Sequence, residues 1–179
     1  VSDDWPDYME TVGRANDVGY RAVGVPGALM GWCHAEEKHG RLGLDTVIQP
    51  AIRYAESGFP ASQYLVDIIT TTQADLARFP ASAEIFLPGG SPPATGDIIV
   101  RSDYARTLRA IAEDGPDVLY HGKIGEMVAD DMAANGGLVT TDDLANYRIH
   151  ERKPVRQTYR EYEIVSTAPT SSGGTHIIQ

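Results

Sequence analysis

The sequence lacks the features that mark proteins of extreme composition. Among its 179 residues there is one cysteine, Cys33, so no internal disulfide can form, and no Cys and His residues stand at the spacing of a zinc finger. Basic residues are scarce, because 15 Lys and Arg face 25 Asp and Glu and leave a formal net charge of −10. This excess of negative charge argues against nucleic acid or an anionic membrane as a partner.

Long hydrophobic runs are also missing. A membrane-spanning helix needs roughly 18 uninterrupted apolar residues, so we expect no membrane span in this chain. Residues 1–6 carry no starting Met and no basic or apolar pattern of a secretory signal, and residues 175–179 read like the first turn of a helix. We expect both ends to be edges of a fragment. With 42% hydrophobic and 22% charged residues, the composition is that of a soluble globular domain.

Helix signals dominate residues 24–150. Pro26 can open a helix that reaches His39, with Gly40 supplying a left-handed C-terminal residue. Pro50 is expected to divide the next segment into two short helices, and Gly58 to end the second one.

Ser62 is a good N-cap for the next helix, which we expect to run through Leu76. Residues 87–96 are rich in Gly, Ser and Pro and predict a loop.

Further along, Ser102 is expected to cap a helix that ends at Gly115, and another helix should run from Ile124 towards residue 136. Thr140 with Asp143 has the spacing of a capping box.

The pattern changes after Pro154. Residues 155–159 and 162–167 alternate with period two, and Arg160-Glu161 between them can form a tight turn, so a β-hairpin is predicted. A loop and the start of a helix follow. We interpret residues 1–179 as one partial domain, with a helical region over 24–150 and a hairpin region over 154–179.

Few side chains suggest chemistry of their own. His34 and His39 lie five residues apart, which places them roughly 140° apart around a helix, so they cannot share a metal on one face. These two, with His121 and His150, are best interpreted as surface residues. Glu36, Glu37 and Lys38 and the pair Asp130-Asp131 are typical of solvated helix faces.

Cys33 follows Leu29, Met30 and Trp32. An apolar setting raises the pKa of a thiol and disfavours the nucleophilic thiolate. We therefore expect Cys33 to serve packing, and Trp32 to anchor the core beside it.

The turn Ser171-Ser172-Gly173-Gly174 is the feature that most suggests a site. Glycines after a strand expose backbone N–H groups that could hold an anion or an oxyanion at a helix start. The turn is not Gly-x-Ser-x-Gly, a phosphate loop or Gly-x-Gly-x-x-Gly. We favour a tight packing turn; a serine nucleophile is the weakest alternative, because no paired His and acid are identifiable, although His176 is close in sequence.

Several short motifs follow one another in order along nearly the whole chain. They are Val25-Pro26-Gly27 with Gly31, His39-Gly40-Arg41-Leu42, Ile48-Gln49-Pro50-Ala51-Ile52, Ala55-Glu56-Ser57-Gly58-Phe59, Leu108 with Ile111-Ala112, Gly115-Pro116, Tyr120-His121-Gly122-Lys123-Ile124, Asn135-Gly136-Gly137-Leu138, Thr140 with Asp143-Leu144 and Tyr147, and Pro169-Thr170-Ser171-Ser172-Gly173-Gly174. In this order they resemble the gamma-glutamyltransferase (gamma-glutamyltranspeptidase) family of N-terminal-nucleophile hydrolases, in the later part of its large subunit.

The resemblance implies a precursor that cleaves itself before a threonine, which then attacks gamma-glutamyl amides such as glutathione. That threonine should lie beyond Gln179, the arginine that grips the substrate α-carboxylate before Val1, and the glycine-rich oxyanion strands in the small subunit. We therefore expect no catalytic, cofactor-binding or metal-binding residue in this chain, and no cofactor. The expected partners are the small subunit and the gamma-glutamyl substrate, and the resemblance suggests a periplasmic or extracellular location.

The implied fold is an α/β (α+β) one: a helix-rich fragment ending in a β-hairpin, part of an αββα sandwich. Two alternatives stay open. Ala168-Pro169-Thr170 stands where relatives often have two prolines, which keeps a related acylase, such as a cephalosporin acylase, in view. The other alternative is a non-catalytic helical scaffold module that binds a partner protein.

Overall fold

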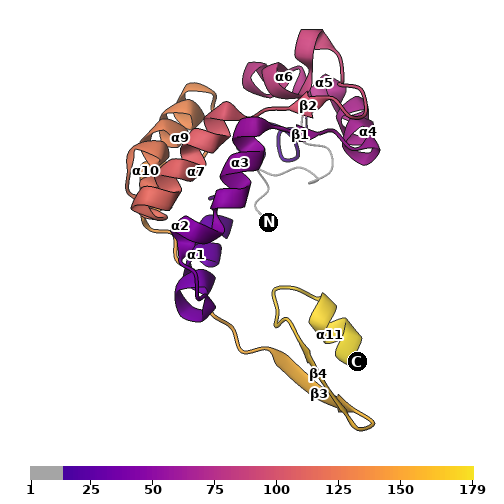
Figure 1. Ribbon diagram of the computed structural model, residues 1–179. Helices are drawn as coiled ribbons and strands as arrows, with labels where there is room; N and C mark the ends of the chain where they lie inside the picture. The colour runs from indigo at the N-terminus through magenta and orange to yellow at the C-terminus, as the bar shows by residue number, and fades with distance from the viewer. Residues whose placement is uncertain (1–13) are drawn as a thin grey trace, which may run out of the picture. The chain divides into compact units, whose positions relative to one another are not determined.

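The computed structural model describes residues 14–179. The chain forms two compact units, the first ending at Tyr147 and the second spanning Arg148–Gln179 (Figure 1). The first unit is helical with one small strand pair, and the second is a hairpin followed by a short helix. Among the described residues, no helix has the length and apolar character needed to cross a membrane.

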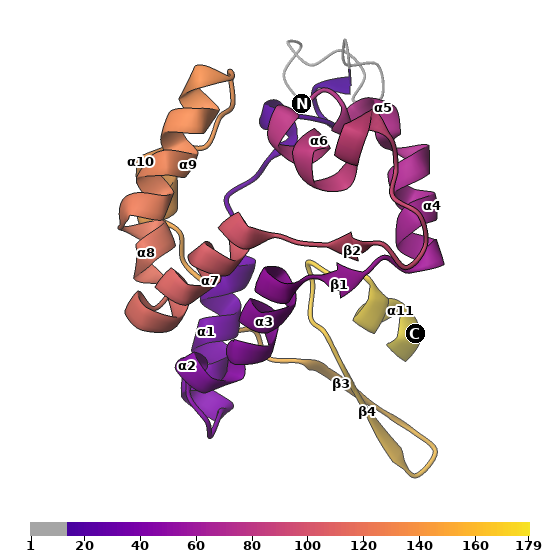
Figure 2. The same ribbon diagram turned by 45° about the horizontal axis from the view of Figure 1, so that its top comes forward.

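The first unit contains η2, α1 to α10, η3 and the strands β1 and β2. In chain order these are η2 (Tyr20–Ala22), α1 (Ala28–His39), α2 (Leu44–Val47), α3 (Gln49–Ser57), β1 (Phe59–Pro60), α4 (Gln63–Thr71), α5 (Gln73–Leu76), α6 (Pro80–Phe86), η3 (Pro88–Gly90), β2 (Ile98–Ile99), α7 (Ser102–Asp114), α8 (Asp117–Tyr120), α9 (Lys123–Ala134) and α10 (Thr141–Ala145). The two strands are antiparallel and pair Phe59 with Ile99 and Pro60 with Ile98 (Figure 2).

The first hydrophobic cluster joins α3 to α7. Ile52 and Ala55 of α3 pack against Ala105 and Leu108 of α7, and all four are buried. In each helix the pair is spaced three residues apart, which places both side chains on one face. The apolar periodicity of these segments therefore produces a helix pair with a common core.

Two further clusters hold the rest of the first unit. One gathers the buried residues Ala61, Ile69, Leu87 and Ile99 around the strand pair and the helices α4 and α6. The other gathers Met132, Val139 and Leu144 around α9 and α10, with the half-buried Tyr20 and Val25 packed against it. Leu144 is fully buried.

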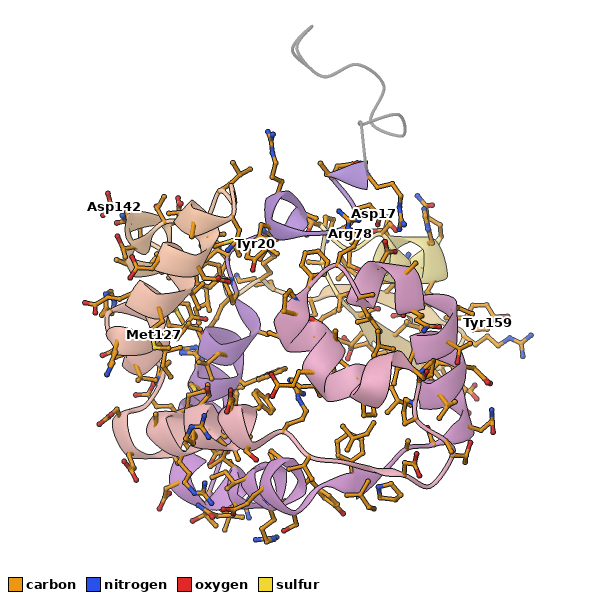
Figure 3. The ribbon with its side chains drawn as sticks, turned by 90° about the horizontal axis from the view of Figure 1, so that it is seen from above. Asp17, Tyr20, Arg78, Met127, Asp142 and Tyr159 are labelled. Atoms are coloured by element: carbon orange, nitrogen blue, oxygen red, sulfur yellow. The ribbon has the colours of Figure 1, made fainter. Side chains whose placement is uncertain are left out.

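Ion pairs fix the first described residues to α5. Arg14 donates to Asp75 at 2.9 Å and to Asp17 at 2.6 Å. Arg78 also pairs with Asp75 at 3.5 Å, so Asp75 lies between Arg14 and Arg78 in this network; Asp17 and Arg78 are labelled in Figure 3. These groups are largely exposed, so the pairs orient the segment more than they stabilise it.

Most predicted helix signals are confirmed. Pro50 lies in the first turn of α3 and separates it from α2, and Gly58 ends α3 with a φ of 80°. The Ser62 hydroxyl accepts from the Leu65 N–H at 3.2 Å. Thr140 and Asp143 form the predicted capping box at the start of α10.

The prediction for Gly40 is wrong. Helix α1 does reach His39, but Gly40 is extended, with a φ of −72°. The left-handed glycine is Gly43, with a φ of 81°, and its N–H donates to the Glu36 carboxylate at 2.9 Å. Glu36 folds back over Gly40 to accept this bond, so it ends the helix and is not a purely solvated residue.

Two other boundary predictions also need correction. Ser102 is the first residue of α7 and makes no capping hydrogen bond, because the N-cap position belongs to Arg101. The helix after Ser62 stops at Thr71, and residues up to Leu76 form the separate helix α5.

The short elements α6, α8, β1 and β2 were not predicted from the sequence. Each of them has too few residues to show a clear hydrophobic period.

The second unit contains the predicted hairpin. Strands β3 (Val155–Tyr159) and β4 (Tyr162–Ser166) pair antiparallel, and Arg160 in the turn between them has a φ of 55°. Helix α11 (Gly173–Ile178) packs against both strands. Gly174 is the single buried residue of this unit.

Candidate functional site

Ser171 and Ser172 of the Ser-Ser-Gly-Gly turn lie between β4 and α11, and Gly173 and Gly174 are the first two residues of α11. Arg152 donates to the Pro169 carbonyl at 2.8 Å and so ties the loop to the segment before β3. Ser172 precedes α11 as its N-cap residue without a side-chain capping bond, and its carbonyl accepts from the His176 N–H at 3.0 Å. The turn is therefore held through its backbone.

The two glycines of this turn are not equivalent. A Cβ on Gly174 would lie 2.1 Å from the Thr167 carbonyl oxygen and 3.0 Å from the Ser166 hydroxyl. A Cβ on Gly173 would meet only the Ser171 hydroxyl, at 3.8 Å. Glycines can be selected for a positive φ or for close approach of the backbone. Both of these glycines are helical and neither has a positive φ, so close approach explains Gly174 alone.

The serines of the turn make no side-chain contact with a base that the described residues reveal. Ser171 and Ser172 are exposed, and no hydrogen bond joins either hydroxyl to a histidine in residues 14–179. A serine nucleophile needs a base at hydrogen-bond distance and a group that orients the base. The arrangement supports a packing turn.

A second group of motif residues meets around Tyr120 in the first unit. The Tyr120 hydroxyl donates to the Pro26 carbonyl at 2.6 Å and accepts from the Met30 N–H at 3.1 Å. Its ring stacks on Tyr147, with centroids 5.8 Å apart and planes 14° apart. Burial raises the pKa of the Tyr120 hydroxyl, so it stays neutral and keeps its proton for the Pro26 carbonyl.

Two glycines near Tyr120 are required by close packing. A Cβ on Gly27 would lie 1.9 Å from the Tyr147 hydroxyl oxygen, and a Cβ on Gly125 would lie 2.1 Å from the Leu119 carbonyl oxygen. Motifs that are far apart in the sequence, around residues 25–27, 120–125 and 147, thus converge on one packed contact. Their role in this chain is to hold helices together.

The chain belongs to the gamma-glutamyltranspeptidase family. Its family model, described as "Gamma-glutamyltranspeptidase", matches residues 5–179. The chain is 42% identical over 159 residues to the glutathione hydrolase proenzyme of Escherichia coli (strain K12), which covers 88% of this chain and 27% of that protein. It is 51% identical over 179 residues to the acylase ACY 1 proenzyme of Pseudomonas sp. (strain SE83), which covers all of this chain and 32% of that protein.

Solved structures of gamma-glutamyltranspeptidases have the same fold. The Helicobacter pylori enzyme matches 99% of this chain and 51% of its own, with a TM-score of 0.92 and 35% identity. A cephalosporin acylase from Bacillus halodurans matches 87% of this chain and 30% of its own, with a TM-score of 0.81 and 30% identity. The expected helix-rich α/β fold with a hairpin, of the N-terminal-nucleophile hydrolase type, is confirmed. The chain spans about a third of the length of the curated relatives it matches.

The remaining residues considered from the sequence are Cys33, Trp32 and four histidines, and they do not gather into one site of this gamma-glutamyltranspeptidase family member. Cys33 is half-buried, and burial raises the pKa of its thiol, which confirms the expected direction. Trp32 is 69% exposed, so the expected core anchor is wrong for this chain, because α1 buries no residue completely. His39, His121 and His150 are exposed as expected, whereas His34 is half-buried.

Sequence reasoning missed the roles of Tyr120 and Gly125, and it did not distinguish Gly174, where the backbone approaches closely, from Gly173. Tyr120 stood inside a recognised motif, but its partners Pro26 and Met30 lie 94 and 90 residues away and only the fold brings them together. No group of three or more His, Cys, Asp or Glu residues within 14–179 is arranged to hold a metal ion.

Proposed function

We propose that this chain is part of the large subunit of a gamma-glutamyltransferase or gamma-glutamyl hydrolase that acts on amides such as glutathione. Its contribution is the helical scaffold and one hairpin. The observation that carries the proposal is the family match over residues 5–179, together with a gamma-glutamyltranspeptidase structure that follows 99% of the chain. Proenzyme relatives about three times as long support a partner subunit from the same precursor.

The proposed chemistry uses a threonine outside these residues. Its hydroxyl attacks the gamma-glutamyl carbonyl, its own α-amine takes the hydroxyl proton, and backbone N–H groups hold the oxyanion. The amine of the substrate leaves with a proton, and a gamma-glutamyl ester of the threonine forms. Water or an amino acid then attacks this ester, and the threonine hydroxyl is regenerated.

Residues of this chain support that chemistry by position alone. The contacts of Tyr120 with Pro26 and of Gly174 with Thr167 support a packing role for the motif residues. We propose that residues 1–179 form one part of the large subunit, with no catalytic, metal or cofactor residue among them. Any gamma-glutamyl compound is then bound by segments outside this chain.

A second candidate is an acylase that cleaves the amide-linked side chain of a cephalosporin. It is favoured by the higher identity of 51% over the entire chain to the acylase ACY 1 proenzyme, against 42% over 159 residues for the Escherichia coli glutathione hydrolase proenzyme. Both candidates use the same threonine chemistry and differ in the acyl group.

The test is a comparison of two substrates on the purified, self-processed parent protein. We expect release of chromophore from a gamma-glutamyl anilide, and a mass spectrum showing two fragments of one precursor. Cleavage of an acyl cephalosporin without action on the anilide would decide for the acylase. Turnover of neither substrate by a fully processed protein would contradict both proposals.

A further inference from the structure

The outer edge of β2 is the part of the first unit that offers unpaired backbone groups. Within the described residues this sheet consists of β1 and β2. One edge of β2 therefore pairs with β1, and its outer edge pairs with no strand. The Ala61 N–H donates to the Asp97 carbonyl at 2.8 Å, and Phe59 stands opposite Ile99. Because hydrogen bonding alternates along an antiparallel strand, Asp97 and Ile99 face β1, and the backbone groups of Ile98 and Val100 face outward.

The side chains at this edge form an apolar strip. Ile98 is 60% exposed and Val100 is 46% exposed, whereas Ile99 between them is buried. Ile98 and Val100 lie on one face of the strand, over Gly58, where a Cβ would come within 2.4 Å of Ile98 Cγ2 and 2.9 Å of Val100 Cγ2. Native edge strands are ordinarily short, charged or covered. This one is short, but its exposed side chains are apolar.

A cavity of about 690 Å³ runs along the same edge. The five consecutive residues 97–101 line it, with Tyr104 and Thr107 of α7 on one side and Ile85 of α6 on another. Arg101 projects a guanidinium into its lining and stacks on the Tyr104 ring at 4.3 Å from the centroid. The Arg101 Nε is buried and has no hydrogen-bond partner in the described part of the chain.

Acidic residues at the cavity do not use this arginine. Asp97 accepts from the Ala94 N–H at 2.7 Å, and Asp103 pairs with Arg106. Buried polar groups are generally satisfied in a native protein. The Arg101 Nε is covered by the chain itself, so an acceptor from outside residues 14–179 would meet the terminal nitrogens of this guanidinium, which make no hydrogen bond within the described chain although Glu84 also lines the cavity.

We propose that an extended segment of the parent polypeptide, outside these 179 residues, adds a third strand to the outer edge of β2. Its backbone pairs with Ile98 and Val100, its apolar side chains cover theirs, and a carbonyl or carboxylate oxygen accepts from Arg101. This mode of binding uses main-chain hydrogen bonds for affinity and side-chain pockets for specificity. The inference rests on the proposed function in one respect, that this chain is part of a longer protein. About two thirds of the length of the acylase ACY 1 proenzyme lies outside the part that this chain matches.

Hydrogen exchange of the Ile98 and Val100 amides tests the added strand. In the isolated chain both amides should exchange fast, and in the parent protein roughly a hundredfold more slowly. Equal exchange in the two proteins would overturn the proposal. Protection that appears in the isolated chain and grows with its concentration would assign the edge to a second copy and would also overturn it.

A matched pair of arginine variants separates docking from stability. Arg101→Met should shift the unfolding midpoint of the isolated chain only slightly, through the lost stacking on Tyr104, and should reduce the protection of Val100 in the parent roughly tenfold. Arg106→Met, five residues along and exposed, should change neither. Loss of protection in both variants, or in neither, would contradict the role of Arg101. None of these readouts requires turnover, so a parent without amidase activity can still confirm the added strand. An active parent with an unprotected edge would refute the added strand and leave the proposed function in place.

Discussion

The two units of this chain differ in where they bury their apolar side chains. Within residues 14–179, the three hydrophobic clusters all belong to the first unit, and every buried hydrophobic residue lies before Tyr147. The second unit buries only Gly174, and its residues Tyr159, Tyr162 and Ile177 are each more than 60% exposed. An isolated two-stranded hairpin is marginally stable in water at best.

Under the proposal that the chain is part of a longer protein, this difference predicts how the two units behave there. The first unit has packed contacts of its own, so mutations there should act on its own stability. The second unit leaves its faces exposed within this chain, and we expect further strands or helices of the proposed parent protein to cover them. Variants in the two units should therefore respond differently to the presence of the rest of the parent.

The largest effect is expected at Gly125 in the first unit. Gly125→Ala places a Cβ 2.1 Å from the Leu119 carbonyl oxygen, which is backbone and cannot turn away. We expect a loss of about 3 kcal/mol in the free energy of unfolding of the isolated chain, measured by urea denaturation.

The control for Gly125 is Gly31→Ala in α1. Gly31 is also helical, but a Cβ there meets nothing within 4 Å. Alanine should stabilise that helix by about 0.5–1 kcal/mol. A similar loss in both variants would show that helix α9 does not depend on its approach to α8.

In the second unit the sensitive position is Gly174. Gly174→Ala should lower the stability of the hairpin region by about 2 kcal/mol, because the new Cβ meets the Thr167 carbonyl. The measurement is hydrogen exchange of the β3 and β4 amides in the parent protein. Gly173→Ala, which has free space, should be tolerated, and an equal effect of the two would contradict the assigned geometry.

Tyr120 tests the convergence of motifs in the first unit. Tyr120→Phe removes the bonds to Pro26 and Met30 and leaves the part-buried Pro26 carbonyl and Met30 N–H without their partner. The expected loss is about 1.5 kcal/mol in the thermal or urea unfolding of the isolated chain. Tyr64→Phe, at a tyrosine that is 76% exposed, should change stability hardly at all.

The smallest effect concerns the capping box of α10. Thr140→Ala removes the hydroxyl that accepts from the Asp143 N–H and should cost about 1 kcal/mol. In the folded chain, bonds from the Thr140 hydroxyl and N–H lower the pKa of Asp143 below its ordinary value of 3.8.

The sign of the pH dependence follows from that shift. Because the folded pKa of Asp143 is the lower one, its contribution is complete above the unfolded pKa and is lost as the pH falls through the folded pKa. Unfolding curves below the ordinary value of 3.8 should therefore converge for the native chain and Asp143→Asn. If the gap between the two curves widens on acidification, the capping box has been misassigned.

Local signals in the sequence were sufficient for much of the fold. Pro50, Gly58, Ser62 and the Thr140 capping box act within one helical turn, so their structural effect can be predicted without tertiary information. The prediction for Gly40 was wrong for an equally local reason. The Glu36 carboxylate accepts from the Gly43 N–H beyond the end of α1, and the left-handed residue is Gly43.

The contacts that define the candidate site could not be predicted in this way. The choice between Gly173 and Gly174 depends on where Thr167 passes, and the bond between Tyr120 and Pro26 spans 94 residues. Trp32 shows that residue type alone can also mislead. Its type predicted burial, but no part of the described chain covers α1 on that side.

Turnover of a gamma-glutamyl anilide by the purified 179-residue chain tests the central claim most directly, since the claim is that this chain is scaffold without a nucleophile. We expect no release of chromophore above a heat-denatured control, while the processed parent turns the anilide over. Activity of the isolated chain that disappears in Ser171→Ala or Ser172→Ala would contradict the account and would place a nucleophile in the Ser-Ser-Gly-Gly turn.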